Sequence, residues 1–510
     1  MVKPMAADDK SILRRAGAMA LALTLGLVLA PDGRAVTLEE AVRAALKTNP
    51  DIGVVVENRR AVNQELSQAR AGFLPTVDIN GSSGHEYASN TTTRARELDG
   101  DDSRTTSLSL TTFGFTIRQL LFDGFDTLSQ VERQEARVRS AARRVRETSE
   151  FIGLDATEAY LESLRQRELI AIAEENVKAH ERFLALVQGR VKGGAAGRAE
   201  EEQARQRLAA SRDAVSQADG LRRDADARYR RVMGEEPVEP MVRSNQPDEA
   251  LPANIDIAIE LAIAFNPTIR VSQSDLQVAE AELKQTTAGY WPTLSFEVNG
   301  NTTRNSGGTR GQSTTVAALL VMNYNLYRGG ADTARRSEFV ARLAEARQRL
   351  AQTQRATDEN TRVAWNAKDN ATERLIQLRA IEKANEAIRD AAQSEFDVGR
   401  RDLLDLLNAE NDYFQAKGNR VSNEFVEMLG KYRLLASTGL LLTALDVEQS
   451  SEAFLSEAES SEFQNSLQKF VEATPVLNFQ NTNTGVPGTG PGQPGLPLNP
   501  NVDLTQPLNP

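Results

Sequence analysis

The stretch AGFLPT at residues 71–76 decides the fold, because it recurs as AGYWPT at residues 288–293, 217 positions later. A second motif, LFDG at residues 121–124, recurs as LYRG at residues 326–329, 205 positions later. One insertion or deletion of 12 residues between the two motifs accounts for the change of offset. Because the matching motifs keep the same order over a long distance, the sequence predicts an internal duplication.

The duplication and the composition divide the chain into five parts. A basic start, a short apolar run and small residues before the cleavage point predict a secretory signal peptide over residues 1–35. The first structural repeat covers residues 36–235 and the second covers residues 254–449, with a proline-rich linker over residues 236–253 between them. Residues 450–510 are acidic and then rich in proline and glycine, so we expect this tail to be disordered.

Each repeat contains a region in which apolar residues alternate along the chain. The alternation lies within residues 76–122 and again within residues 293–327, which predicts a pair of two-faced strands in each repeat. Apolar alternation with aromatic residues near the strand ends is typical of outer-membrane barrels. Four strands cannot close a barrel, so insertion into a membrane requires several copies of the chain. A soluble hairpin packed on the helices is the alternative interpretation.

A long helical hairpin follows each strand pair, over residues 126–233 and 331–445. The first long helix spans about 100 Å at about 1.5 Å per residue, and the helix that returns is about half as long. We expect the helix over residues 254–288 to continue the first return helix end to end, and the helix over residues 37–71 to continue the second. Apolar residues that recur every seven positions predict coiled-coil packing of the first long helix: Val131, Val138, Val145, Ile152 and Ala159.

The composition excludes several classes of protein. The chain has no cysteine, which argues against a disulfide framework or a cysteine-based metal site, and its net charge of −11 argues against a nucleic-acid binder. Its two histidines, His85 and His180, lie far apart in the sequence, and no nucleophile elbow, phosphate-binding loop or zinc-protease motif is present. We therefore expect no enzymatic activity, no cofactor and no metal.

Taken together and in this order, the motifs resemble the TolC-type outer-membrane efflux and type I secretion channels over about residues 37–445. One of them is VGRRDLLDLLNA at residues 398–409; each motif is weak alone, and their order and repetition carry the resemblance. The resemblance implies an α+β membrane protein that forms a homotrimer. Four strands from each protomer would make a 12-stranded barrel in outer-membrane lipid, continuous with an α-helical coiled-coil barrel in the periplasm of a Gram-negative bacterium.

The resemblance also implies a function. The chain would be the passive exit duct of a tripartite export machine, gated by iris-like movement of its periplasmic helix pairs. Its partners would be a periplasmic adaptor and an inner-membrane ABC transporter or proton-driven pump. The absence of a cysteine for lipid attachment favours type I protein secretion. A multidrug efflux channel is the alternative, and a periplasmic adaptor with one coiled-coil hairpin is the alternative from another class.

Candidate site residues follow from the same resemblance. Asp405 matches an aspartate that forms a ring of three carboxylates in the trimer, and Asn408 stands where many members carry a second aspartate. Arg401 and Glu200 match the partners of a gate latch, and Phe396 stands where the family pattern has a tyrosine. Ordinary solvated charges on a helix face are the alternative for Arg401 and Asp405. Two glycine-containing turns are candidate docking points for an adaptor: Gly193, Gly194, Gly197, Gly399 and Arg400.

Overall fold

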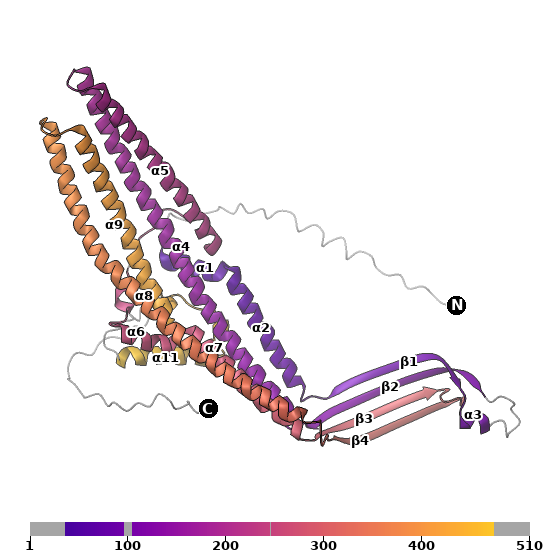
Figure 1. Cartoon of the computed structure of the whole chain (residues 1–510). Coiled ribbons are helices and arrows are strands. Elements are labelled where there is room, and N and C mark those ends of the chain that lie inside the picture. Colours follow the sequence, from indigo (N-terminus) through magenta and orange to yellow (C-terminus); the bar gives the residue numbers. More distant parts are fainter. Residues whose placement is uncertain (1–35, 96–104, 245, 474–510) are drawn as a thin grey trace, which may run out of the picture.

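The computed structural model describes residues 36–95, 105–244 and 246–473, so the predicted signal peptide lies outside the described residues. The protomer is elongated, with a four-stranded sheet at one end and long helices that lead away from it (Figure 1). Each repeat contributes two strands and one long helical hairpin, and the two repeats lie side by side along the whole length of the protomer. Within the described residues, none of the helices is both long enough and apolar enough to cross a membrane.

Each repeat begins with two short helices separated by an Asn-Pro pair. The first repeat has α1 (Leu38–Thr48) and α2 (Pro50–Ala71), and the second has α6 (Ile255–Phe265) and α7 (Pro267–Gln285). The asparagine before each proline caps the next helix, because its side-chain oxygen accepts hydrogen bonds from the first amides of that helix. The proline then occupies the first helical position, which it favours.

The sheet joins the two repeats. Its strand order is β1-β2-β3-β4, and every neighbouring pair is antiparallel. The pairing of β2 with β3 therefore brings one repeat directly beside the other. A short helix, α3 (Thr91–Ala95), follows β1. The strands are β1 (Thr76–Ala88), β2 (Thr106–Phe122), β3 (Thr293–Arg304) and β4 (Gln312–Asn323).

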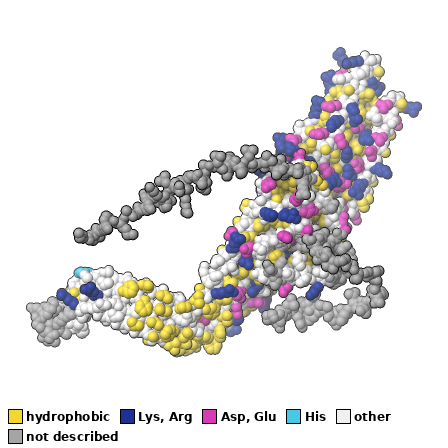
Figure 2. All heavy atoms as spheres, turned by 180° about the vertical axis from the view of Figure 1, so that it is seen from behind, with side chains coloured by type: hydrophobic (Ala, Val, Ile, Leu, Met, Phe, Trp, Pro, Cys, Tyr) yellow, Lys and Arg dark blue, Asp and Glu magenta, His cyan; other side chains and the backbone are white. Residues whose placement is uncertain are grey.

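The register gives the sheet one apolar and one more polar face. Ile79 lies opposite Phe115, and Phe115 lies opposite Gly300 on the next strand. The Phe115 ring covers Gly300 so closely that a Cβ added at that glycine would collide with it. Side chains one position along each strand point to the other face, and those are mostly polar, as at Asp78 and Thr116. Hydrophobic side chains gather over the strand region in Figure 2.

The long helices are the structural copies that the duplication predicts. Helices α4 (Asp126–Lys192) and α8 (Ala331–Asp397) have 67 residues each, and their return helices α5 (Arg198–Met233) and α9 (Leu403–Thr438) have 36 each. Helix α4 is central, because it packs against α5 and α9 and also against α2 and α7. All five positions of the predicted seven-residue repeat in α4 are buried: Val131, Val138, Val145, Ile152 and Ala159.

The partners predicted for the end-to-end stacking of the short helices are wrong. Helix α5 meets α1 and α2 of its own repeat: Thr48 Oγ1 donates to the Met233 carbonyl at 2.7 Å, and Asn49 Nδ2 donates to the Val232 carbonyl at 3.2 Å. In the second repeat Asn266 Nδ2 donates in the same way to the Ser437 carbonyl near the end of α9, at 2.8 Å. The asparagine amide therefore joins each return helix to the short helices of the same repeat. Its oxygen caps the short helix that follows it, while its nitrogen donates to a carbonyl near the end of the return helix.

The prediction of a disordered tail is wrong for its first part. Helix α11 (Glu457–Ala473) packs on α6, where Leu467 is buried in a cluster with Leu261 and Leu440. Phe463, four positions before Leu467, packs against the same cluster, and residues four apart share one face of a helix. This apolar face explains the order. Residues 474–510 of the tail lie outside the described residues. Short elements complete the part of the chain that the structure describes: α10 (Leu441–Ala444) and the 3₁₀ turns Asp248–Ala250, Thr286–Tyr290 and Ser451–Ala453.

Candidate functional site at the hairpin turns

The turn between α4 and α5, residues 193–197, is called the first turn below. Gly194 has φ +75°, a left-handed conformation that glycine adopts without steric cost. The amide of Gly194 donates to the Val191 carbonyl at 3.0 Å, and the amide of Ala195 donates to the Arg190 carbonyl at 2.8 Å. These two bonds form a Schellman motif, which satisfies the last carbonyls of α4.

The turn between α8 and α9, residues 398–402, is called the second turn and has the same backbone. Gly399 has φ +74°, and its amide donates to the Phe396 carbonyl at 3.0 Å. The amide of Arg400 donates to the Glu395 carbonyl at 2.9 Å. Because the hydrogen bonds match residue by residue at the offset of 205, the two turns are copies of one structure that carry different side chains.

Asp405 and Asn408 lie on the first turns of α9, and both are exposed in the protomer. Residues three apart share a helix face, so the two side chains project from the same side of α9. Asn408 Oδ1 accepts a hydrogen bond from Arg207 Nη2 at 2.8 Å, which links α9 to α5. Among the residues that the structure describes, Asp405 has no ion-pair partner. Its carboxylate is therefore available to a neighbouring copy, a cation or water.

The two predicted latch residues do not meet within one protomer. Arg401 Nε donates to Glu395 Oε2 at 2.8 Å, within its own hairpin. Glu200 Oε1 accepts a hydrogen bond from the Gly197 amide at 3.4 Å, as a residue at the third helical position often does. A contact between Arg401 and Glu200 of different protomers remains a prediction.

Phe396 is a packing residue in this structure. Its side chain is 3% exposed and lies in a cluster that joins the two hairpins near their turns. The Arg190 guanidinium lies 4.8 Å from the centre of the Phe396 ring, a cation–π contact across the two hairpins that sequence reasoning missed. The other buried members of the cluster are Ala179, Phe183, Val187, Ala204, Ala392, Leu403, Leu406, Leu407 and Ala409.

Two buried charges on α4 were also missed, because charged residues on a helix are predicted to face water. Glu150 is 2% exposed and accepts a hydrogen bond from the Leu442 amide at 3.4 Å, and burial raises the pKa of its carboxyl to about 7. One turn earlier, burial lowers the pKa of the Arg146 guanidinium to about 10, and that group lies 3.6 Å from the centre of the Phe463 ring on α11. Both groups therefore hold the segment that follows α9 against α4.

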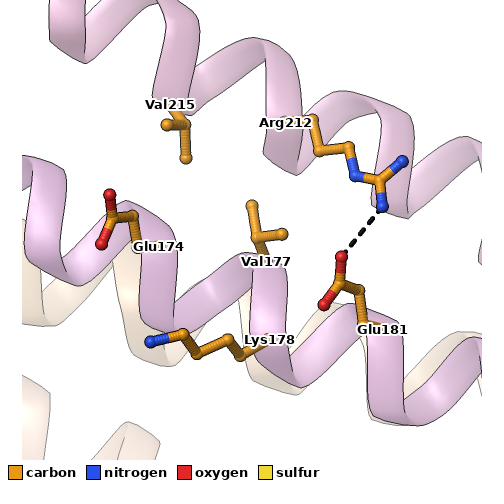
Figure 3. Close-up of a pocket in the computed structure, with 6 residues that line it drawn as sticks. All are labelled: Glu174, Val177, Lys178, Glu181, Arg212 and Val215. Atoms are coloured by element: carbon orange, nitrogen blue, oxygen red, sulfur yellow. Dashed lines mark hydrogen bonds and ion pairs between the residues drawn. The ribbon is translucent and has the colours of Figure 1, made fainter.

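An open groove of about 260 Å³ lies between α4 and α5, with a salt bridge of 2.9 Å between Glu181 and Arg212 at its rim (Figure 3). Val177 and Val215 lie between the charged side chains, which are those of Glu174 and Lys178 besides the paired ones. The groove contains no nucleophile with an adjacent base. Within residues 36–95, 105–244 and 246–473, no group of three acidic or histidine side chains could hold a metal ion.

A two-faced four-stranded sheet joined to 67-residue helices is the protomer architecture of an outer-membrane export channel. The chain belongs to the outer membrane efflux protein family, whose model matches residues 41–235 and 258–424. The family resemblance and the fold class predicted from the sequence are thereby confirmed. Members of this family are outer-membrane channels and not enzymes, so the protein is an export duct located in the outer membrane and extending through the periplasm.

Individual relatives cover nearly the whole fold. The outer membrane efflux protein BepC of Brucella suis is 25% identical over 79% of this chain and 85% of its own length. The alkaline protease secretion protein AprF of Pseudomonas aeruginosa is 24% identical over 84% of this chain and 90% of its own length.

Solved structures share the fold at lower identity. The outer-membrane channel OprN has a TM-score of 0.67 at 20% identity and covers 79% of this chain and 89% of its own. The Campylobacter jejuni CmeC outer membrane channel also has a TM-score of 0.67, at 14% identity, over 84% of this chain and 88% of its own.

Proposed function

We propose that three copies of this chain form the exit duct of a type I protein secretion machine. Two relatives that cover most of the chain are named for protease secretion, AprF of Pseudomonas aeruginosa and PrtF of Dickeya chrysanthemi. The lack of cysteine, which leaves no residue for a lipid anchor, supports the same branch. BepC, named for efflux, supports multidrug efflux as the second candidate.

The open edges of the sheet are the observation that carries the oligomer. β1 pairs only with β2, and β4 only with β3, within the described residues. An unpaired strand edge in lipid costs several kcal/mol for each unsatisfied backbone group. Since the four strands alternate in direction, β4 of one copy can pair antiparallel with β1 of the next. Three copies give the 12-stranded barrel that the family resemblance implies, within the size range of outer-membrane barrels.

The helical half has matching open edges. Helix α4 packs against both α5 and α9, and α8 packs against α9, so α5 and α8 lie at the two sides of the protomer near the turns. Apolar side chains remain exposed along α8, and contact with α5 of the neighbouring copy would cover them: Val363, Ile376, Ile381 and Ile388.

The gate and the docking points are part of this proposal. Asp405 from three copies would form a carboxylate ring at the periplasmic entrance, beside Asn408. Arg401 would bind Glu200 of a neighbouring copy in the closed state, while Phe396 packs the two hairpins of one protomer together. The first and second turns would contact the hairpin of a periplasmic adaptor, which links the duct to an inner-membrane ABC transporter.

Two measurements test the proposal. Membrane fractionation should recover the chain in the outer membrane as a heat-resistant trimer, and recovery in the soluble periplasm would contradict it. Cross-linking in cells, with mass spectrometry of the inner-membrane protein recovered, separates the two candidates. An ABC transporter supports protein secretion, and a proton-driven pump supports multidrug efflux.

A further inference from the structure

We propose that Asp78 forms a second charge filter inside the strand-built part of the channel, distant from the hairpin turns. The inference rests on the proposed trimer. Asp78 is the third residue of β1, close to the junction with the helices. Its neighbours along the strand, Val77 and Ile79, are exposed and belong to the apolar face. Since side chains alternate along a strand, Asp78 points to the opposite face.

The polar character of that face is visible in the packing around Gly114. A Cβ added at Gly114 would lie 2.7 Å from Asn80 Oδ1 and 3.4 Å from Asn301 Oδ1, so two amide side chains cover this glycine from neighbouring strands. Asn80 is two positions after Asp78 and therefore shares its face. When an apolar sheet face contacts lipid, the other face lines the lumen of the barrel. Asp78 consequently faces the lumen.

The charges on the lumen face do not cancel. Arg118 lies opposite Glu297 in the register of β2 and β3 and forms an ion pair with it at 3.4 Å. Ser295 Oγ also donates to Glu297 Oε1 at 3.2 Å, so the Glu297 carboxylate is engaged twice. Asp78 forms no ion pair within the part of the chain that the structure describes. Near the junction, each protomer thus contributes one uncompensated negative charge.

Strand formation does not explain an aspartate at this position. Aspartate is among the residues depleted in strands. Ser295, the counterpart of Asp78 at the offset of 217, occupies the same place in the second repeat without a charge. Glu86 lies on the same strand and the same face, about 26 Å from Asp78 along β1. Its carboxylate accepts a hydrogen bond from the Gly307 amide at 3.2 Å. Asp78 is therefore the charged group near the junction that has neither an ion pair nor a side-chain hydrogen bond among the described residues.

In a trimer the three Asp78 carboxylates lie at one height around the lumen. A ring of carboxylates in a channel creates a negative potential that concentrates cations and excludes anions. The potential extends over a Debye length, about 10 Å at 0.1 M salt and about 3 Å at 1 M. The barrel therefore selects for cations at low salt even when the periplasmic entrance is open.

The test is single-channel recording in planar bilayers under a KCl gradient. Asp405→Asn is the background, because it removes the predicted carboxylate ring at the entrance. Adding Asp78→Asn should lower the potassium-over-chloride permeability ratio about twofold near 0.1 M KCl and hardly at all near 1 M. Asn299 lies on the same rung of the sheet, as the register Asp78–Thr116–Asn299 shows. Adding Asn299→Asp should restore the ratio.

The outcomes separate this inference from the proposed function. Channels of normal conductance whose permeability ratio is unchanged by Asp78→Asn at low salt would overturn the role of Asp78. The absence of any channel or trimer from the unmodified chain would overturn the duct itself. If Asp78→Asn does not assemble, Asp78→Ser supplies the residue found at the equivalent position of the second repeat, and the same comparison applies.

Discussion

The Arg190 guanidinium lies 4.8 Å from the centre of the Phe396 ring, and this contact joins the end of α4 to the end of α8. The two long helices come from different repeats, so the contact links the duplicated hairpins where they approach their turns. Phe396 is almost fully buried there. Any movement that separates the hairpins must break this contact and expose the apolar cluster around it.

Truncating Phe396 should loosen the hairpin ends. Phe396→Ala is expected to cost about 3–5 kcal/mol of local stability, because it removes a buried ring and leaves a cavity. Amide hydrogen exchange in residues 179–191 and 392–409 measures the effect. Phe396→Leu is the matched control and should cost less than Phe396→Ala, because it keeps an apolar side chain and leaves a smaller cavity. Equal exchange in both variants would contradict the packing role.

Arg401 can restrain the closed channel in two ways, by binding Glu200 of a neighbouring copy or by binding Glu395 of its own hairpin. Combining Arg401→Ser with Glu200→Ala should raise the conductance of the closed channel in bilayers, if the two residues meet between protomers. Glu395→Gln removes the partner that Arg401 has within its own hairpin, at 2.8 Å. An equal rise in conductance from Glu395→Gln alone would show that the restraint lies within the hairpin, where an exposed pair contributes about 0.2–1 kcal/mol.

Asp405 provides the test of the entrance ring. Asp405→Asn should reduce cation selectivity and weaken block by multivalent cations, because three carboxylates in a constriction attract such ions strongly. The readout is single-channel current with and without a trivalent cation. Asp412→Asn, an exposed aspartate further along α9, is the control and should leave block unchanged. Unaltered block in Asp405→Asn would exclude the ring.

The buried Glu150 predicts a dependence of stability on pH. Burial raises the pKa of this carboxyl from its ordinary 4.5 to about 7 in the folded protein, so folding takes up a proton between these values. The protonated Glu150 carboxyl therefore contributes to the free energy of unfolding fully below pH 4.5. This contribution, at most about 3 kcal/mol, is lost as the pH rises through 7. The protection factors of the amides in residues 440–449, measured by hydrogen exchange at pH 5 and at pH 8 and corrected for the intrinsic exchange rate at each pH, report this loss of stability.

Glu150→Gln is the informative variant for that measurement. Glu150→Gln should abolish most of the difference in protection factor between pH 5 and pH 8, since the glutamine side chain does not titrate. Glu147→Gln, on the same helix but only half-buried, is the control. A pH dependence that persists in Glu150→Gln would assign it to another group.

The two faces of β4 give a matched pair of substitutions. Leu320 lies opposite Phe296 on the apolar face, whereas Leu319 lies opposite Glu297 on the polar face. Leu320→Arg should hinder assembly in the outer membrane, because an arginine on the lipid face costs about 2–4 kcal/mol near the bilayer midplane. Leu319→Arg should assemble normally. The yield of heat-resistant trimer measures both, and equal yields would contradict the assignment of the faces.

Local sequence patterns were sufficient for much of the fold. The repeated AGFLPT and LFDG motifs located the strand pairs, and the seven-residue spacing from Val131 to Ala159 predicted the buried face of α4. These features depend on residues near one another in the chain, because strand alternation and helix periodicity are set by local geometry. The turn glycines were predictable for the same reason, since a left-handed backbone favours glycine.

Contacts between distant residues decided the rest. Asn49 and Asn266 join each return helix to its own repeat, and α11 covers α6 through Phe463 and Leu467. The pairing of Arg118 with Glu297, which leaves Asp78 uncompensated, requires the register between strands of different repeats. By itself, the sequence thus determined the elements, their order and their apolar faces. Only the tertiary structure decided which elements meet and which charges are paired, because those energies depend on distances that no local pattern specifies.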